Sequence, residues 1–277
     1  MTLSALENAD LRYISLGAGV QSSVLALMAS RGEIGPMPDC AVFADTQWEP
    51  KGIYEHLDWL ETQLSFPVYR VTLGDIRTIA LGTTDGKRAP SMPVFLKTAK
   101  GGMAWRQCTN DFKIQPIQKK VRQLLGYGNG KRLPKDTQVE SWMGISRDES
   151  HRMKNSRDKW ITNRYPLIEQ MMSRHDCQIW FNDNYPRRLL SRSACIGCPY
   201  RSDDSWRQMR DHDHDSWTDA VAFDHALRSG QRNAFGMDAE VYLHKNMIPL
   251  DEVDLSTAID QGQLSMFGEE CEGLCGV

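Results

Sequence analysis

The amino-acid sequence predicts an α/β fold in which helices flank a parallel β-sheet, and three observations support this prediction. Short apolar runs, typical of buried strands, occupy residues 11–15, 40–46 and 67–73. A helical pattern of apolar residues lies between the first and second runs, and another, at residues 53–64, lies between the second and third. This βαβαβ order predicts right-handed crossovers, which place a ligand at the carboxyl ends of the strands.

The two helices of this unit follow from apolar spacing. The first is expected to begin near Ser22 and to end at Gly32. The second repeats its apolar residues at intervals of three and four. The inward-facing residues are Val24, Leu25, Leu27 and Met28 in the first helix, and Ile53, Leu57, Leu60 and Leu64 in the second.

The rest of the chain is less regular. Residues 74–112 show little periodicity, which predicts a long loop that serves a site or is mobile. A helix is expected from about Lys113, a strand over 137–146, and mostly helices after Pro166, namely 176–181, 203–210 and 216–228. The 277 residues suffice for one large domain with a smaller appendage. The predicted division is an α/β domain (8–210), a helical C-terminal extension (211–261) and a flexible tail (262–277).

Composition restricts the class of protein. No apolar run approaches the length of a membrane span, and the N-terminus lacks the basic-then-apolar pattern of a signal peptide. A cytoplasmic protein without a membrane partner is therefore expected. In that compartment the seven cysteines indicate metal ligands or reactive thiols rather than disulfides.

The net charge of −3 conceals a strong asymmetry along the chain. Residues 113–135 contain seven Lys or Arg and no acid, and residues 187–210 contain six Arg against two Asp. The segment from residue 236 onward carries nine acids and one Lys. The basic stretches predict either a surface for phosphates or nucleic acid, or two solvated faces balanced by an acidic tail. An oligomer is compatible with either interpretation.

A glycine-rich turn, SLGAGVQSS, joins the first strand to the first helix. Gly17 and Gly19 let the backbone approach an anion closely, and Ser22 and Ser23 offer hydroxyls at a helix N-terminus. The turn lacks the lysine of a Walker loop and the third glycine of a dinucleotide fingerprint. It therefore indicates a pyrophosphate cradle, with a purely structural strand-to-helix turn as the alternative.

This turn resembles the PP-loop of the ATP-pyrophosphatase superfamily, in which a serine-glycine-glycine-x-aspartate-serine run grips the phosphates. Gly17 stands at the place of the first serine and Gln21 at the place of the aspartate, so the resemblance leaves Mg²⁺ dependence open. It implies that the nucleotide-binding residues are Ser15, Gly17, Ala18, Gly19, Gln21, Ser22 and Ser23.

Two further segments resemble phosphoadenosine phosphosulfate (PAPS) reductases. FADTQWEP is similar to their FADTGWEP-type segment, which implies nucleotide contacts from Asp45 and Thr46; the alternative is a helix cap before Pro50. GISRDESHR is similar to their GLRRDES-type segment, which implies that Arg147 and Arg152 present guanidinium groups to phosphate or sulfate oxygens. An exposed helix with ion pairs is the alternative for the second segment.

Three cysteines form a predicted sulfur site. Cys195 and Cys198 make a Cys-x-x-Cys unit, a spacing that lets two thiolates meet one metal or cluster. Cys108 lies in RQCTNDFKIQP, which resembles the RCCxxRKVxP segment of adenylylsulfate (APS) reductases. Those enzymes pair this segment with a later Cys-x-x-Cys to hold a [4Fe–4S] cluster. In this chain Thr109 stands at the second cysteine place, and Lys113 matches the family's lysine, which implies a catalytic role for it.

The fourth cluster ligand is not determined by the resemblance. Cys177 is one candidate, and its alternative is a buried apolar residue of the core. A three-cysteine cluster with one open iron is another possibility, as in related sulfur transferases. Cysteine spacing alone does not choose the metal, so zinc is the alternative to iron.

The chain ends in EECEGLCGV, which is similar to the ECGLH-type tail of PAPS reductases, whose cysteine attacks the sulfonate sulfur. Cys271 falls on that cysteine, and Cys275 replaces the histidine. A flexible tail can deliver a thiol to a site and withdraw it for reduction. The alternative is a pair of terminal thiols without a role.

Together the ordered segments resemble the PAPS reductase-like branch of the PP-loop superfamily, especially members carried by bacteriophages and mobile elements. The resemblance implies a Rossmann-like (HUP/adenine nucleotide alpha hydrolase-like) fold, an ATP, PAPS or APS ligand and a thioredoxin-like reductant. Three functions stay open. They are thiol-dependent reduction of adenylylated sulfate to sulfite, ATP-dependent adenylation and sulfur transfer to a nucleic acid, and a non-catalytic nucleic-acid-binding module with structural zinc.

Overall fold

A parallel five-stranded sheet forms the centre of the computed structural model, which describes residues 5–82, 92–104, 106–128, 130–190, 193–228 and 239–256. Its strand order is β3-β2-β1-β5-β6, and every neighbouring pair is parallel. The strands are β1 (Leu11–Leu16), β2 (Cys40–Asp45), β3 (Val68–Thr72), β5 (Val139–Met143) and β6 (Ile161–Arg164). This arrangement confirms the predicted α/β class. The strand order reverses between β1 and β5, which is where open α/β sheets bind ligands.

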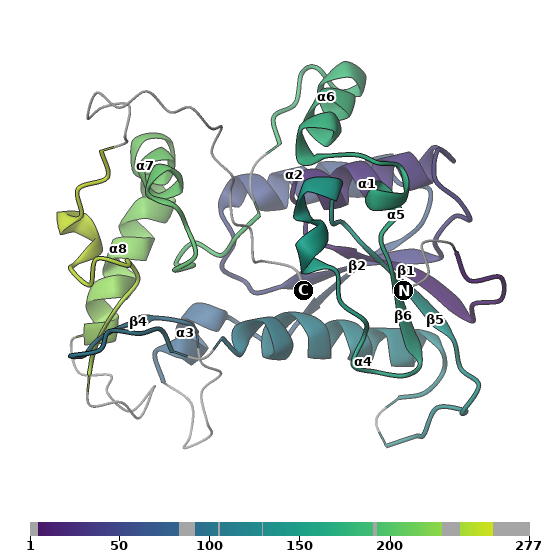
Figure 1. The fold of residues 1–277 in the computed structure, drawn as a ribbon, viewed down its shortest axis with the longest axis horizontal. Helices are drawn as coiled ribbons and strands as arrows, with labels where there is room; N and C mark the ends of the chain where they lie inside the picture. Colours follow the sequence, from purple (N-terminus) through teal and green to yellow (C-terminus); the bar gives the residue numbers. More distant parts are fainter. Residues whose placement is uncertain are drawn as a thin grey trace.

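Helices cover both faces of this sheet (Figure 1). On one face lie α1 (Val20–Ser30) and α2 (Lys51–Gln63), and α6 (Arg174–Asn184) packs against α1. On the other face lies α4 (Gln115–Leu124). The apolar residues of the strands are buried on both faces, as expected for a parallel sheet between two helical layers.

A second core lies beside the sheet, on the left of Figure 1. Its helical elements are α7 (Asp203–His212), α8 (His214–Arg228), the short α3 (Ile76–Ala80) and the 3₁₀ turn η4 (Leu250–Glu252). A two-stranded antiparallel sheet of β4 (Phe95–Lys97) and β7 (Glu240–Tyr242) completes it. Trp206 and Phe223 are fully buried there, and Trp48, after β2, joins this core to the main sheet.

Several predictions of local structure need correction. Residues 74–112 are not one irregular loop, since they contain α3, β4 and η1, a π-helical segment (Thr109–Ile114) that leads into α4. These elements are too short to show periodicity, and β4 pairs with a strand far away in the sequence. β6 and α5 (Pro166–Glu169) were not predicted from the sequence, whereas the 3₁₀ segment η2 (Arg147–Arg152) matches the alternative of a helix with ion pairs for that segment. The tail predicted to be flexible lies outside the described residues.

Among the described residues, no helix combines the length and the apolar character that crossing a membrane requires.

A buried histidine joins the two helices on the first face. The Nε2 atom of His56 in α2 lies 2.9 Å from the Oγ atom of Ser23 in α1. The Nδ1 atom has no hydrogen-bond partner in the described part of the chain. Burial, with a smaller contribution from the charge of Arg188, lowers the pKa of His56 to about 4. The folded protein therefore holds this imidazole neutral at pH 7.

This lowered pKa predicts a loss of stability in mild acid. An unfolded histidine has a pKa of about 6.5, so the unfolded chain binds the proton first and gains stability as the pH falls from about 6.5 to about 4. The free energy of unfolding, measured by urea titration, should fall by up to about 1.4 kcal/mol per pH unit in this window because of this one group. His56→Gln, whose amide can still bond to Ser23, should fall less steeply. Parallel curves for the two proteins would contradict this assignment.

Candidate functional site

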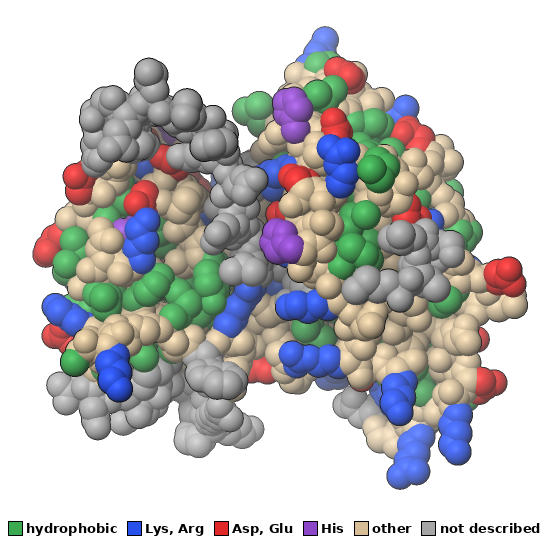
Figure 2. Space-filling model, viewed as in Figure 1, with side chains coloured by type: hydrophobic (Ala, Val, Ile, Leu, Met, Phe, Trp, Pro, Cys, Tyr) green, Lys and Arg blue, Asp and Glu red, His purple; other side chains and the backbone are tan. Residues whose placement is uncertain are grey.

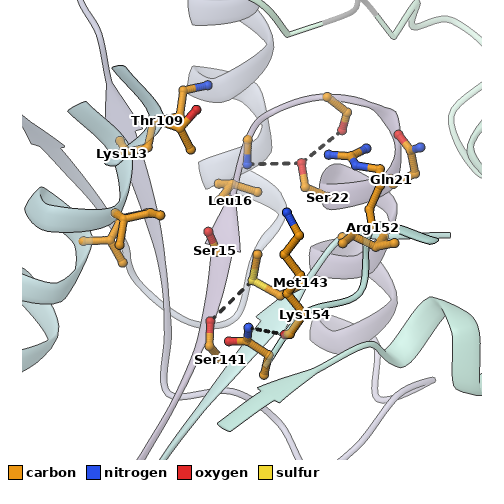
Figure 3. Close-up of a pocket in the computed structure, with 18 of the residues that line it drawn as sticks. Ser15, Leu16, Gln21, Ser22, Thr109, Lys113, Ser141, Met143, Arg152 and Lys154 are labelled. Atoms are coloured by element: carbon orange, nitrogen blue, oxygen red, sulfur yellow. Dashed lines mark hydrogen bonds between the residues drawn. The ribbon is translucent and has the colours of Figure 1, made fainter. Parts of the chain in front are cut away.

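A cavity of about 520 Å³ opens at the carboxyl ends of β1 and β5, where the strand order reverses. The turn after β1 forms one wall, and η1 with the start of α4 forms another. The segment from Gly144 to residue 158 forms a third. This volume lies within the range of small-molecule and cofactor sites. Figure 3 shows Arg152 beside Gln21 and Ser22, with Thr109 and Lys113 on the opposite side.

The glycine-rich turn lines this cavity with backbone atoms and small side chains. The Oγ atom of Ser22 accepts a hydrogen bond from the Gly17 N–H at 3.2 Å and lies 3.3 Å from the Gly19 carbonyl oxygen, to which it donates (Figure 3). Gly19 caps α1 and has no side chain to accept the N–H groups of the first turn. A Cβ atom added to Gly19 would come only within 3.6 Å of Ser193. The start of α1 therefore offers N–H groups and the positive end of the helix dipole to an anion in the cavity.

Most of the residues named from the PP-loop resemblance line the cavity, but two do not. The lining residues are Ser15, Gly17, Gly19, Gln21 and Ser22. Ala18 is buried with a φ of 54°, a conformation that favours glycine, so it shapes the turn. Ser23 is fully buried beneath the turn, at His56.

Basic side chains surround the glycine-rich turn. Arg106 and Lys113 lie on the wall formed by residues 106–118, and Arg152, Lys154 and Arg174 lie on the other side. The Nη1 atom of Arg152 lies 2.7 Å from a carboxylate oxygen of Glu149. This distribution suits a ligand with several negative charges.

A smaller cavity of about 30 Å³ lies beside the first and contains the thiols. Cys108, Cys195 and Cys198 line it, together with Thr46. The two cavities share three lining residues: Arg106, Thr109 and Lys113. The fold thus brings together three cysteines from two distant parts of the sequence, next to the glycine-rich turn.

The Cys-x-x-Cys turn is held rigidly against Trp48. The Ile196 N–H donates to the Trp48 carbonyl oxygen at 2.8 Å. A Cβ atom added to Gly197 would lie 2.2 Å from the Trp48 ring, so only glycine fits there. The Sγ atom of Cys195 lies 3.3 Å from the Thr46 hydroxyl and 3.7 Å from the Oε1 atom of Glu49. Thr46 therefore faces a thiol and not the large cavity.

The thiol cavity does not fit a four-iron cluster in this conformation. Three thiols are soft ligands suited to zinc or iron. A cavity of about 30 Å³ holds roughly one or two water-sized particles, however, which is too little for a cubane. Among the residues that the structure describes, no three His, Cys, Asp or Glu side chains are arranged to hold a metal ion.

Three other residues named from the sequence lie away from both cavities. Cys177 is fully buried between α6 and α1, where burial raises its pKa to about 12, so the structure does not bring it to the other three cysteines. Asp45 accepts hydrogen bonds from the Tyr54 hydroxyl at 2.8 Å and the Gln47 N–H at 2.7 Å, which is a local structural role. Arg147 is exposed and does not line the large cavity. Cys271 and Cys275 lie outside the described residues.

The sequence analysis missed several lining residues. Glu49 is buried at the cavity edge and accepts a hydrogen bond from Ser193 at 3.3 Å. Glu49 and Arg106 stand inside the two segments that carry the family resemblance, which was an available signal. Arg174 begins α6 directly after the capping residue Ser173. A capping box predicts such a helix start, but not that it faces the cavity.

Comparisons with known proteins give limited information. No family model matches this chain, and no curated protein matches it. Among solved structures it is similar to a phosphoadenylyl-sulfate (PAPS) reductase from Candida auris, determined as a phosphate complex. The TM-score is 0.40 and the sequence identity is 14%, over 69% of this chain and 79% of that chain. A similarity this low carries no argument about function.

Proposed function

We propose that this chain is an enzyme that binds an adenine nucleotide over residues 15–23 and uses cysteine thiols to reduce an adenylylated sulfate to sulfite. One observation carries the proposal: the cavity over the glycine-rich turn and the thiol cavity share Arg106, Thr109 and Lys113 as a common wall. The motif resemblances to PAPS and APS reductases agree with this combination of sites.

The cavity provides separate environments for the parts of such a substrate. The phosphates would lie on the turn and the first N–H groups of α1. Phe43, Ile114 and Ile117 give an apolar wall suited to a base. The sulfonate would point toward the shared wall, where Lys113 offsets the charge that develops on the departing phosphate.

The proposed reaction has two steps. The Cys271 thiolate, delivered by the tail, forms a bond to the sulfonate sulfur; the bond from that sulfur to the phosphate oxygen breaks, and the nucleotide leaves with the electron pair. A thiolate of a dithiol protein then attacks the Cys271 sulfur, and sulfite leaves with the electron pair of the broken S–S bond. The Cys271 thiol and one thiol of the dithiol protein are thereby oxidised to a mixed disulfide, while the sulfate sulfur is reduced to sulfite.

The test is sulfite release from PAPS and from APS in the presence of a thioredoxin-type reductant. Wild-type protein should release sulfite from at least one of them. Cys271→Ser should abolish release while binding of the nucleotide is kept. The matched control is Cys40→Ala, because Cys40 is buried in β2 and lines neither cavity. Unchanged sulfite release by Cys271→Ser would exclude the proposed nucleophile.

A second function is favoured by exposed positive charge at the mouth of the cavity. Lys154 and Arg157 line the cavity, in the segment that follows β5, and both side chains are exposed. Figure 2 shows Lys and Arg side chains in the middle and at the lower right of one face. Such a surface suits ATP-dependent adenylation of a nucleic acid and transfer of sulfur to it. Pyrophosphate release from ATP that requires added DNA or RNA, and weakens with salt, would select this function over sulfate reduction.

A further inference from the structure

We infer that Arg174, held in place by Gln21, binds the nucleotide phosphates, and that Arg174 and Arg152 together take the place of a divalent cation at this site. The inference rests on the proposed nucleotide binding in the large cavity, but not on the sulfur chemistry. It assigns a role to Arg174, whose position in the sequence did not suggest one, and adds Arg152, for which the family resemblance implied phosphate or sulfate contacts.

The Gln21 side chain connects α1, to which it belongs, with η2 and with α6. It lies in the first turn of α1, lines the cavity and is only 7% exposed. Its Nε2 atom lies 3.4 Å from the Oγ atom of Ser146 and 3.3 Å from the Oε2 atom of Glu149. Its Oε1 atom accepts a hydrogen bond from the Nη1 atom of Arg174 at 3.0 Å. The amide is thus engaged on both sides, and it brings no charge to the turn.

Arg174 retains donors for an anion. It is the first residue of α6, it lines the cavity, and its backbone N–H donates to Asp148 at 3.0 Å. Its guanidinium group makes one side-chain hydrogen bond in the described part of the chain, to Gln21. A guanidinium group has five N–H donors, so four are left to bind phosphate oxygens.

The charges at this point disfavour a cation and favour phosphate. Glu149 is the carboxylate nearest to Gln21, and it is paired with Arg152 at 2.7 Å, with both side chains largely buried. Asp148 of η2 and Asp176 of α6 accept hydrogen bonds from the backbone N–H groups of Arg174 and Ser173, at the start of α6. In nucleotide sites, Mg²⁺ is held by one or two carboxylates together with the substrate phosphates and waters, so a carboxylate must be available to it. An amide, one paired carboxylate and two guanidinium groups therefore do not fit Mg²⁺, whereas they fit a phosphate.

The experiment is calorimetric titration of the full-length protein with ADP and with adenosine, in excess EDTA and in excess MgCl₂. The dissociation constant for ADP should agree within about twofold in the two buffers. Arg174→Ala should weaken ADP binding about 10- to 100-fold, as expected for one charged hydrogen-bond partner, and should leave adenosine binding unchanged. Gln21→Ala should have a smaller effect of the same kind, because Arg174 is then present but not held.

The matched control is Arg210→Ala, because Arg210 is exposed on α7 and pairs only with its neighbour Asp211 among the described residues. ADP binding that strengthens more than about tenfold with Mg²⁺ would overturn the inference and leave the sulfate-reduction proposal standing. Equal loss of adenosine and ADP binding in Arg174→Ala would also overturn it, since that indicates a distorted cavity. Metal-independent ADP binding without any sulfite release would support the inference and reject the reaction. If folded wild-type protein binds neither ligand, both proposals fail.

Discussion

Gly144→Ala is expected to weaken ADP binding about 10- to 100-fold, because the new methyl group would displace the turn that we propose binds the phosphates. Gly144 follows β5 directly and packs against the start of α1. A Cβ atom at this position would lie 2.8 Å from the Cα atom of Ser22 and 2.9 Å from its backbone nitrogen. Backbone atoms cannot rotate away as a side chain can, so the first turn of α1 must move. Each phosphate–amide hydrogen bond that is misaligned as a result costs about 1.5–3 kcal/mol.

The measurement is calorimetric titration with ADP, accompanied by urea denaturation to verify that the variant is folded. Gly128→Ala is the matched control, because, apart from its chain neighbours, no atom of the described residues lies within 4 Å of a Cβ atom built there. It should bind ADP like the wild type. Wild-type affinity in folded Gly144→Ala would show that the nucleotide does not depend on this turn, and the proposed site would be wrong.

Asp224→Ala is expected to reduce the free energy of unfolding by about 3–5 kcal/mol. Asp224 lies in α8 and is fully buried. Its Oδ1 atom accepts from the Leu243 N–H at 2.9 Å, and its Oδ2 atom accepts from the Leu250 N–H at 2.9 Å and from Arg228 at 2.7 Å. Truncation leaves two buried N–H groups and one guanidinium group without their acceptor. The hydrogen bonds that join α8 to Leu243 and Leu250 are then lost.

Urea denaturation of the variant and wild type measures this difference. The matched control is Asp211→Ala on α7, because Asp211 is exposed and its partners Arg207 and Arg210 are solvated. Its cost should stay below about 1 kcal/mol. A similarly small cost for Asp224→Ala would show that the second core does not depend on this carboxylate.

The first three strands and both helices between them were predictable because their signals are local. Buried parallel strands consist of almost continuous apolar residues, and the helices repeat theirs every three or four residues. The structure places these strands at Leu11–Leu16, Cys40–Asp45 and Val68–Thr72. By contrast, β4 and β7 have three residues each, and their pairing depends on a contact across much of the chain. No local sequence pattern predicts such a pairing.

The residues of the candidate site likewise divide into those that a local sequence pattern predicts and those that only the tertiary structure identifies. The glycines of the turn and the Cys-x-x-Cys unit were visible in the sequence because their spacing acts within one turn of backbone. Asp45 also stood out, but its carboxylate accepts hydrogen bonds from Tyr54 and Gln47, donors that the chain directly after β2 supplies. Cys177 was a plausible fourth ligand by residue type alone, and the packing of α6 on α1 places it in the core.

The sequence by itself determined that a glycine-rich turn follows the first strand and that cysteines suited to sulfur or metal chemistry occur in two later segments. Only the tertiary structure decided that Cys108 meets Cys195 and Cys198 in one cavity, and that Arg174 reaches Gln21 from the start of α6. The reason is physical. Glycine, proline and apolar spacing act over a few residues, whereas convergence on a site depends on how the helices pack around the point where the strand order reverses.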